Sequence, residues 1–396
     1  MALVVQQAET EWGGVKMDDV PQTVVHIVLT MESGGLETVV YDLCNSTDRT
    51  HFRPEILCLQ RYDVRYLERL AENDIPVTLM KKHFKLDIGY FFRVARFLRQ
   101  RHTRIVHAHS GCFFYAALFA LLARCHRMVY TAHGLPVLNR LQDKIEDNLA
   151  GLFCQRVLAV SDEVAACLKK RMPLIAGKIE CLTNGIDTYR FRPFNDPEAK
   201  VVTRTRFSLP ADALLFGSVG RLAPEKNYQL LLRAFAQFQQ QLPELKKHLV
   251  FIGDGLQRRE LEILRGELGL DAQVTFLGNQ CQVEHIMPML DVFVLSSLTE
   301  GTSISLLEAQ SCGVPAVATD VGGNGNVIIT GLTGLLSPSG DVDAMADRFI
   351  CLATQPWLRD ELGKGARQRV VEDFSLQKMV NKYAKVYYAC SPTRVG

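Results

Sequence analysis

The sequence predicts an α/β protein with two doubly wound, parallel-sheet domains that face each other across a cleft. The chain has 396 residues, more than a single hydrophobic core usually organises. Short apolar runs alternate with amphipathic stretches on both sides of residues 184–199, where two prolines and little periodicity indicate a linker. Strands that alternate with helices are typical of a parallel sheet covered by helices on both faces.

The first half contains seven apolar runs that we interpret as the strands of one sheet. These runs are residues 24–29, 55–59, 77–80, 105–108, 128–131, 157–160 and 179–182. Amphipathic stretches between them predict helices, for example at residues 36–45, 90–101 and 113–124.

The second half repeats the same rhythm after the linker. Its predicted strands are residues 214–219, 249–252, 274–277, 292–295 and 315–318. Its predicted helices are residues 228–241, 256–268, 306–312, 342–353 and 357–373. Ligands of such sheets bind at the carboxyl ends of the strands, so the cleft between the domains is the expected site.

Composition and charge exclude several classes of protein. The net charge is +2, with +4 in residues 1–192 and −2 in residues 193–396, and neither value suggests a nucleic-acid partner. The eleven cysteines are scattered and never form C-x-x-C, which argues against a zinc site or a disulfide framework. We see no secretory signal, and the apolar stretch 112–123 is about half as long as a bilayer requires. We therefore expect a cytoplasmic protein.

The most informative segment is residues 300–312, EGTSISLLEAQSC. It follows the predicted strand 292–295 and opens a helix, and its two carboxylates, Glu300 and Glu308, stand eight positions apart. A helix N-terminus offers backbone N–H groups to a phosphate, and carboxylates accept hydrogen bonds from sugar hydroxyls. The segment therefore suggests a nucleotide-sugar pocket.

A structural alternative also fits this segment. Ser305 could cap the helix while Glu308 reaches back to it, which would form a capping box. That arrangement would explain Glu308 without a ligand.

Other candidate site residues also follow predicted strands. Gly34 and Gly35 follow the first strand and open a helix, although a glycine pair is often just a tight turn. Residues 107–109, His-Ala-His, end the fourth strand, and His133 follows the fifth. A single histidine at a strand end is more often structural than catalytic.

A pair of cations follows the first strand of the second half. Arg221 and Lys226 stand five positions apart in a strand-to-helix loop and could clamp a diphosphate, or could be two solvated charges. The chain has no P-loop, no complete G-x-G-x-x-G after the first strand, no Asp-x-Asp at a strand end and no G-x-S-x-G.

Taken together, these motifs resemble the family 4 retaining glycosyltransferases, which have the two-domain GT-B fold. The resemblance covers about residues 24–390 and is closest to the bacterial polysaccharide and exopolysaccharide sugar transferases. Its most specific part is the Glu-x7-Glu segment with the continuation through Gly323. It implies a loose tail (1–22), a first domain (23–188), a donor domain (200–373) and a C-terminal helix (374–396) that crosses back to the first domain.

The resemblance implies a role for each candidate residue. Arg221 and Lys226 would bind the donor diphosphate with the backbone amides of Ser303, Ser305, Leu306 and Leu307, while Gly34 and Gly35 let the first domain approach the phosphates. Glu308 would bind the ribose, Glu300 the transferred sugar, and His133 would lie near the reacting carbon.

The sequence departs from the family pattern at three places. Relatives often continue Gly-Gly-x-Pro-Glu, whereas this chain has Gly325 and Asn326 after the glycine pair. Thr302 and Ile304 stand where many relatives carry Phe and Leu, which would alter the choice of sugar.

The resemblance implies transfer of a sugar, with retention and without a metal or other cofactor, from a UDP- or GDP-linked donor to a hydroxyl in polysaccharide or glycolipid assembly. The acceptor would be a saccharide or a lipid-linked molecule. Two alternatives stay open: another enzyme on the same fold, such as a sugar-nucleotide epimerase or a phosphorylase, and an inactive relative that only binds nucleotide sugars.

Residues 81–104 form a basic, amphipathic stretch. They carry eight Lys/Arg and one acid, with Tyr90, Phe91, Val94, Phe97 and Leu98 on one predicted helical face. The stretch is either an ordinary surface helix or a dock for anionic lipid at the inner face of the membrane.

Overall fold

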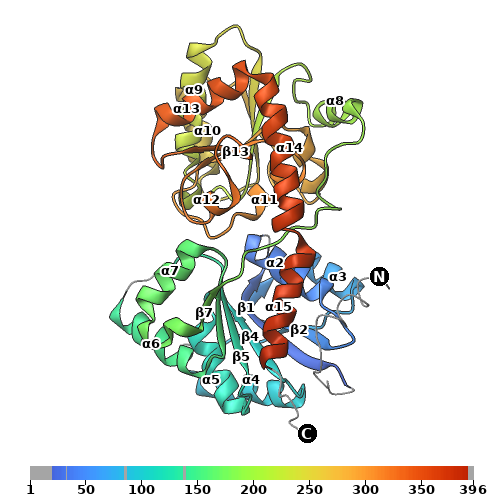
Figure 1. Ribbon diagram of the computed structural model, residues 1–396, viewed down its shortest axis with the longest axis vertical. Coiled ribbons are helices and arrows are strands. Elements are labelled where there is room, and N and C mark those ends of the chain that lie inside the picture. The colour runs from blue at the N-terminus through green and yellow to red at the C-terminus, as the bar shows by residue number, and fades with distance from the viewer. Residues whose placement is uncertain (1–19, 33, 84–86, 137–139, 391–396) are drawn as a thin grey trace.

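The structure is a computed structural model that describes residues 20–32, 34–83, 87–136 and 140–390. It contains two separate parallel sheets, each flanked by helices, which lie one above the other (Figure 1). The predicted fold class is confirmed. The predictions for residues 1–19, 84–86 and 391–396 lie outside the described residues.

The first sheet has seven strands in the order β3-β2-β1-β4-β5-β6-β7. The strands are β1 (Gln22–Met31), β2 (Phe52–Tyr62), β3 (Val77–Leu79), β4 (Ile105–His109), β5 (Met128–Ala132), β6 (Arg156–Ala159) and β7 (Ile179–Cys181). The helices are α2 (Gly35–Ser46), α3 (Val64–Glu72), α4 (Ile88–Gln100), α5 (Phe113–Ala123), α6 (Leu141–Phe153) and α7 (Asp162–Arg171). The strand order reverses between β1 and β4, which makes their carboxyl ends the expected ligand side.

The second sheet has six strands in the order β10-β9-β8-β11-β12-β13. The strands are β8 (Leu214–Val219), β9 (Lys247–Ile252), β10 (Val274–Phe276), β11 (Val292–Leu295), β12 (Ala316–Thr319) and β13 (Gly334–Ser337). The helices are α8 (Pro197–Arg206), α9 (Tyr228–Gln241), α10 (Arg258–Glu267), α11 (Ile304–Ser311), α12 (Asn324–Val327), α13 (Val342–Thr354) and α14 (Pro356–Asp373). Here the order reverses between β8 and β11.

The central strands are buried on both faces, which explains their continuous apolar sequences. Val25, Ile27 and Val28 of β1 are fully buried, as are Val292 and Phe293 of β11. Parallel strands covered by helices on both sides require such residues.

The main differences from the sequence prediction concern one strand and two helix starts. β13 was not predicted, because its sequence, Gly-Leu-Leu-Ser, contains only two apolar side chains. α8 begins at Pro197, inside the predicted linker, where Asp196 caps it by accepting a hydrogen bond from the amide of Glu198. α11 begins at Ile304, two residues before the predicted start.

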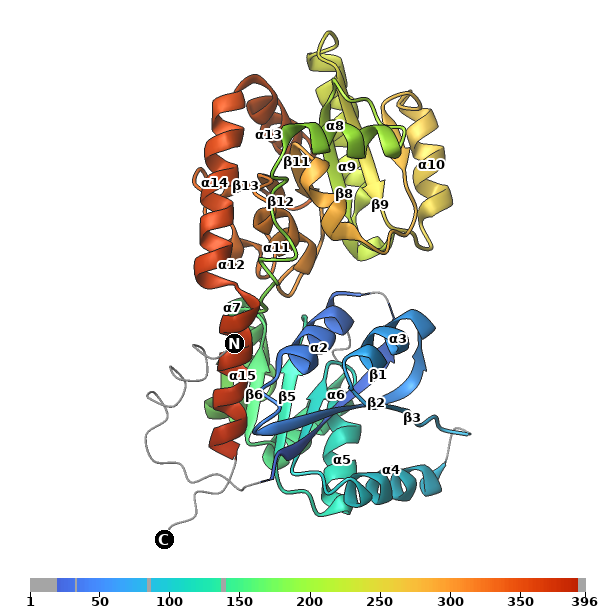
Figure 2. The ribbon, with the colours of Figure 1, turned by 90° about the vertical axis from the view of Figure 1, so that its right-hand side faces the viewer.

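The last helix, α15 (Leu376–Cys390), returns to the first sheet. α14 lies along the upper unit and α15 continues down over the lower one (Figure 2). Tyr383 and Tyr387 of α15 are fully buried, and the Tyr387 ring lies 5.4 Å from that of Phe52 in β2. One hydrophobic cluster therefore contains residues of both sheets and of α15. Across the described part of the chain, no helix has the length and apolarity needed to cross a membrane.

Candidate active site

The carboxyl ends of the two sheets meet at the loop between β11 and α11. A Cβ atom added to Gly301 would lie 2.2 Å from the carbonyl oxygen of His133, so the two backbones are in direct contact. The Thr302 hydroxyl donates a hydrogen bond to the Val160 carbonyl, and the Asn184 amide donates to the Thr302 carbonyl at 3.3 Å. The loop that carries Glu300 is thereby held against the first unit, which brings Glu300 and His133 to the same place.

Glu300 and Lys226 form the central ion pair of the site. Lys226 Nζ lies 2.6 Å from Glu300 Oε1, and the side chains are 20% and 10% exposed. The Ser297 hydroxyl donates to the same oxygen at 2.6 Å. Lys226 follows β8 and Glu300 follows β11, so the pair bridges the reversal point of the second sheet. Low exposure fixes both charges in position.

Arg221 is much more exposed than Lys226. Its guanidinium donates to Glu225 Oε1 at 2.6 Å and is 71% exposed. It also interacts electrostatically with Glu37 of α2, across the cleft, where burial raises the pKa of Glu37. The structure thus places both predicted cations in the loop after β8, with only Lys226 largely enclosed by protein.

The N-terminus of α11 is capped by Ser303. The Ser303 hydroxyl accepts from the amide of Leu306 at 3.4 Å, and its carbonyl accepts from the amide of Leu307 at 3.2 Å. Two of the predicted phosphate-binding amides, those of Leu306 and Leu307, are therefore already used by the cap. The amides of Ile304 and Ser305 have no partner within the helix, as expected for a first turn.

This cap contradicts the capping-box alternative for Glu308. Ser303 rather than Ser305 is the N-cap, so Glu308 is the fifth residue of the helix. A capping box needs its acid at the third helical position, and Glu308 lies too far along to reach the cap. The alternative was wrong because it set the helix start two residues late.

Glu308 instead faces a group of charged side chains from both units. Burial raises the pKa of Glu308 to about 7, and the positive charge of Arg190 opposes this rise. The negative charges of Asp42 and Glu284 add to it. Burial also raises the pKa of Asp42 to about 7. Arg190 already forms an ion pair with Glu284 at 2.9 Å. Its positive charge therefore only partly offsets the effect of burial on the pKa values of Glu308 and Asp42.

Asp42, Arg190 and Glu284 also line a cavity of about 410 Å³ between the two units. Asp42 comes from α2, Arg190 from the connection after β7, and Glu284 from the 3-10 turn Val283–His285. The cavity is therefore shared by both units, and three of its lining residues are the charged groups that act on Glu308. It is polar, which suits a hydroxyl-rich ligand.

The two predicted glycines lie directly opposite α11. A Cβ added to Gly35 would contact the side chain of Ile304 at 3.4 Å, and one added to Gly34 would lie 2.4 Å from the Glu37 carboxylate. Any side chain at Gly34 would displace that carboxylate. Gly35 thus lies against the N-terminus of α11, where a Cβ would make an ordinary contact, and it is the Glu37 carboxylate rather than α11 that leaves no room for a side chain at Gly34.

The unusual asparagine at position 326 contacts the opposite unit. Asn326 Nδ2 donates to Asp162 Oδ2 in α7 at 2.8 Å. The preceding glycines pack on the Glu300 loop: Gly323 N donates to Gly301 O at 2.6 Å, and a Cβ at Gly322 would overlap the carbonyl of Glu300. A glutamate at position 326 would place a second carboxylate beside Asp162.

His133 is held by its backbone and its ring. Its amide donates to the Ser110 hydroxyl at 2.8 Å, and its Nε2 lies 2.9 Å from His109 Nδ1. Burial lowers its pKa to about 3, so the ring is neutral at physiological pH. Neutral imidazole can orient a hydroxyl but adds no charge.

Sequence reasoning missed several residues of the site. These are Ser297, Asp42, Arg190 and Glu284. Ser297 could have been found, because it stands just after the predicted strand 292–295. Asp42 and Arg190 could not, since one lies within a helix and the other within a linker.

Two models of known families match the chain. One describes glycosyl transferases group 1 and matches residues 202–369; the other describes glycosyltransferase family 4 and matches residues 33–190. Together they cover the second sheet, the first sheet except β1, and nearly all of the site described above.

Curated relatives agree with these matches. The chain is 31% identical over 242 residues to D-inositol 3-phosphate glycosyltransferase of Saccharomonospora viridis, a match that covers 59% of this chain and 55% of the relative. It is 25% identical over 312 residues to the UDP-Gal:alpha-D-GlcNAc-diphosphoundecaprenol alpha-1,3-galactosyltransferase of Escherichia coli, covering 76% and 79%.

Solved structures show the same fold. Anabaena HepE in complex with UDP and glucose superposes with a TM-score of 0.83 and 20% identity, over 93% of this chain and all of that one. WaaG, a glycosyltransferase involved in lipopolysaccharide biosynthesis, superposes with a TM-score of 0.71 and 17% identity, over 94% and 100%.

Proposed function

The chain belongs to the family 4 glycosyltransferases, and on that premise we propose that it transfers a sugar from a nucleoside diphosphate donor to a hydroxyl of a saccharide or lipid-linked acceptor. Such donors expose two phosphates, a ribose and a sugar, and the cleft has a matching group for each. The related galactosyltransferase uses a UDP sugar and HepE was solved with UDP, which favours UDP as the nucleotide.

The observation that carries this proposal is the Lys226–Glu300 pair at the N-terminus of α11. Lys226 and the amides of Ile304 and Ser305 provide positive charge where the diphosphate leaves. Glu300, held by Lys226 and Ser297, accepts hydrogen bonds from the hydroxyls of the transferred sugar. Glu308 and the adjoining cavity receive the ribose and the base.

We also propose that transfer needs no metal and retains the configuration of the sugar. Cationic side chains and a helix N-terminus can stabilise the leaving diphosphate, which is the role a metal would otherwise fill. Closure of the two units would position the acceptor hydroxyl on the face that the diphosphate leaves. The new bond would form on that same face, which retains the configuration, and the leaving phosphate would accept the acceptor's proton.

A direct assay tests the transferase proposal. The protein is incubated with UDP- and GDP-linked sugars and a crude lipid or saccharide acceptor, and release of nucleotide is measured with and without EDTA. We expect acceptor-dependent release of UDP that persists in EDTA. Strict dependence of nucleotide release on Mg²⁺ or Mn²⁺ would contradict the proposal that transfer needs no metal.

The same assay separates the two alternatives. Conversion of the nucleotide sugar to an isomer without an acceptor would identify an epimerase. A rise in melting temperature with UDP, combined with no turnover of any donor, would identify a relative that only binds.

We propose further that α4 docks on anionic lipid, which would bring the protein to a lipid-linked acceptor. Its apolar face is buried as predicted at Tyr90, Val94, Phe97 and Leu98, and Phe91 is partly buried. Its outer face exposes Arg96 and Arg99 together with Ile88 and Phe92, the last two at 72% and 56%. Each basic residue near a negatively charged surface contributes roughly 1 kcal/mol to binding.

Sedimentation with vesicles tests the docking proposal. We expect the protein to sediment with vesicles that contain anionic lipid at low salt, and to be released at high salt. Replacing Arg96 and Arg99 with Gln should abolish sedimentation. Replacing Arg258 and Arg265 of α10 in the same way serves as the control, and equal recovery with neutral and anionic vesicles would contradict the proposal.

A further inference from the structure

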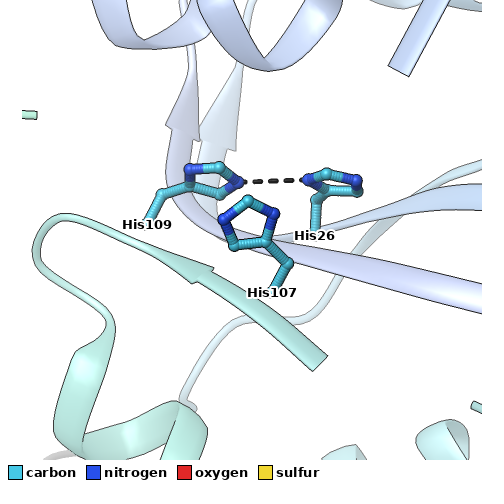
Figure 3. A group of neighbouring side chains, drawn as sticks. All are labelled: His26, His107 and His109. Carbon is cyan, nitrogen blue, oxygen red and sulfur yellow. Dashed lines mark hydrogen bonds between the residues drawn. The ribbon is translucent and has the colours of Figure 1, made fainter. Parts of the chain in front are cut away.

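Three histidines form a hydrogen-bonded chain that runs from the cleft into the first sheet. His133 Nε2 lies 2.9 Å from His109 Nδ1, and His109 Nε2 lies 3.1 Å from His26 Nδ1. The second of these contacts is drawn in Figure 3. His133 follows β5, His109 ends β4 and His26 lies in β1, so the chain crosses the reversal point of the sheet. We refer to these three residues as the histidine chain.

A fourth histidine, His107, lies beside the chain but bonds elsewhere. Its ring centroid is 4.2 Å from that of His109. However, its Nδ1 lies 2.7 Å from the Tyr387 hydroxyl and its Nε2 lies 2.8 Å from the Thr131 hydroxyl. Both ring nitrogens are therefore already in use.

The spacing of these rings also permits a metal site. Nitrogens of His26, His107 and His109 lie within 4.8 Å of one another. A metal would need one lone pair from each ring, and would have to break one of the two His109 contacts and one of the His107 hydrogen bonds. The observed contacts therefore favour a chain of shared protons over a metal site.

The number of ring protons allows only two arrangements of N–H groups along the histidine chain. Burial lowers the pKa of His26 and His133 to about 3, and that of His109 well below its usual value, so each ring is neutral with one proton. Two of the three protons occupy the two contacts between rings. The third must lie at one end, on His26 Nε2 or on His133 Nδ1. Both end atoms are buried without a hydrogen-bond partner among the described residues.

The two ends differ in what they can bind. His26 is fully buried within the sheet, whereas His133 borders the cleft and is partly exposed. A buried N–H group without an acceptor is rarer, and more unfavourable, than a buried lone pair without a donor. His133 Nδ1 is itself buried in this conformation. The unshared proton should nevertheless lie at the His133 end, because only that side chain borders the cleft, where closure around a donor can bring an oxygen to accept it.

We propose that His109 and His26 are positioning residues that hold His133 as the Nδ1–H tautomer, so that it donates a hydrogen bond to an oxygen of the bound sugar donor. In this state His26 Nδ1–H donates to His109 Nε2, and His109 Nδ1–H donates to His133 Nε2. The identity of the ligand rests on the proposed function, but the tautomer of His133 does not.

Nitrogen NMR of the complete protein, labelled with ¹⁵N in its histidines, tests the tautomer directly. In the wild type, we expect His133 Nδ1 to show the shift of a protonated, pyrrole-like nitrogen and His133 Nε2 that of an unprotonated, pyridine-like one. The reverse pattern in the wild type would overturn the proposal, even if no variant folds.

Variants test whether the chain determines this tautomer. His109→Phe removes both contacts and should leave His133 as a mixture of tautomers. His109→Asn keeps an amide near the position of Nδ1, and should restore the single tautomer. Tyr383→Phe removes a buried hydroxyl that contacts Thr131 in the same polar core, outside the chain, and should change nothing.

Kinetics supply a second readout. His26→Phe does not touch the cleft, yet it should lower kcat about fivefold, a change typical of one hydrogen bond, with KM for the donor nearly unchanged. Unchanged kcat together with unchanged ¹⁵N shifts of His133 would refute the proposal. Uptake of one Zn²⁺ per chain with a shift of the His26 and His107 signals would replace it with the metal site. If no donor is turned over, the proposed function fails while the NMR result still stands.

Discussion

The two sides of the cleft differ in charge. We call the side formed by the second unit the upper wall and the side formed by the first unit the lower wall. The upper wall is ionised: Lys226 and Glu300 are paired at 2.6 Å, and Arg221 lies beside them. The lower wall uses neutral rings, because burial keeps His133 and His109 uncharged. Charges stabilise a leaving group, whereas neutral hydrogen bonds orient a substrate. Under the proposed function, the upper wall would stabilise the leaving diphosphate and the lower wall would position the sugar.

The largest expected effect is on the ionised wall. Lys226→Ala should reduce turnover by about 10² or more, because a charge-assisted contact to the diphosphate is lost and Glu300 remains without its cation. Arg221→Ala should weaken donor binding in the same direction. Steady-state kinetics of both variants, with Lys246→Ala as an exposed control, measure this. If both variants turn over the donor at the wild-type rate, Lys226 and Arg221 do not bind the diphosphate.

The two glutamates should separate binding from transfer. Glu308→Ala should weaken binding of free UDP by about tenfold, as expected for loss of one hydrogen bond to the ribose. Glu300→Ala should leave that affinity intact and reduce transfer. Calorimetry and turnover distinguish the two. Equal loss of UDP affinity in both variants would contradict the division of roles.

A change in the neutral wall should affect turnover but not UDP affinity, unlike the changes at Lys226 and Arg221. His133→Ala should lower turnover about tenfold while UDP affinity changes little, since one hydrogen bond to the sugar is lost and no charge is removed. Steady-state kinetics give the change in kcat, and calorimetry gives the change in UDP affinity. A large loss of UDP affinity would mean that both walls hold the nucleotide.

The raised pKa of Glu308 predicts how stability depends on pH. Its folded pKa of about 7 lies above its unfolded value, so the folded state holds the extra proton and stability falls as pH rises from about 4.5 to 7. Glu308→Gln should remove a part of this fall on the order of 1 kcal/mol. Asp42 has the same sign, so the slope becomes shallower rather than flat. Denaturant titrations at both ends of this range test this, and an unchanged slope would contradict it.

The smallest effect concerns the contact that joins the walls. Asn326→Glu should destabilise the closed arrangement by about 0.5 kcal/mol, because it sets a second carboxylate against Asp162. Adding Asp162→Asn to the Asn326→Glu variant should reverse most of this loss. A double-mutant cycle read from UDP affinity and thermal unfolding measures the coupling, and additive effects would show that the contact is unimportant.

Much of the fold and part of the site could be predicted from the sequence, for a physical reason. Strand ends and helix starts are local patterns, so Glu300, Lys226 and His133 stand out as polar residues after apolar runs. The cap of α11 was misplaced because Ser303 and Ser305 are equally good capping residues, and only the backbone decides between them. The partners of Glu308 come from three distant segments, and no local pattern connects Asp42 to Arg190.

The return of α15 to the first sheet has a consequence for how the protein is made. Tyr383 and Tyr387 bond to Thr131 and His107, which were synthesised more than 250 residues earlier. Until the ribosome has added this helix, the first sheet lacks one of its covering helices and its buried histidine lacks a hydroxyl partner. The first sheet can therefore acquire its last covering helix only after the second half of the chain has been synthesised.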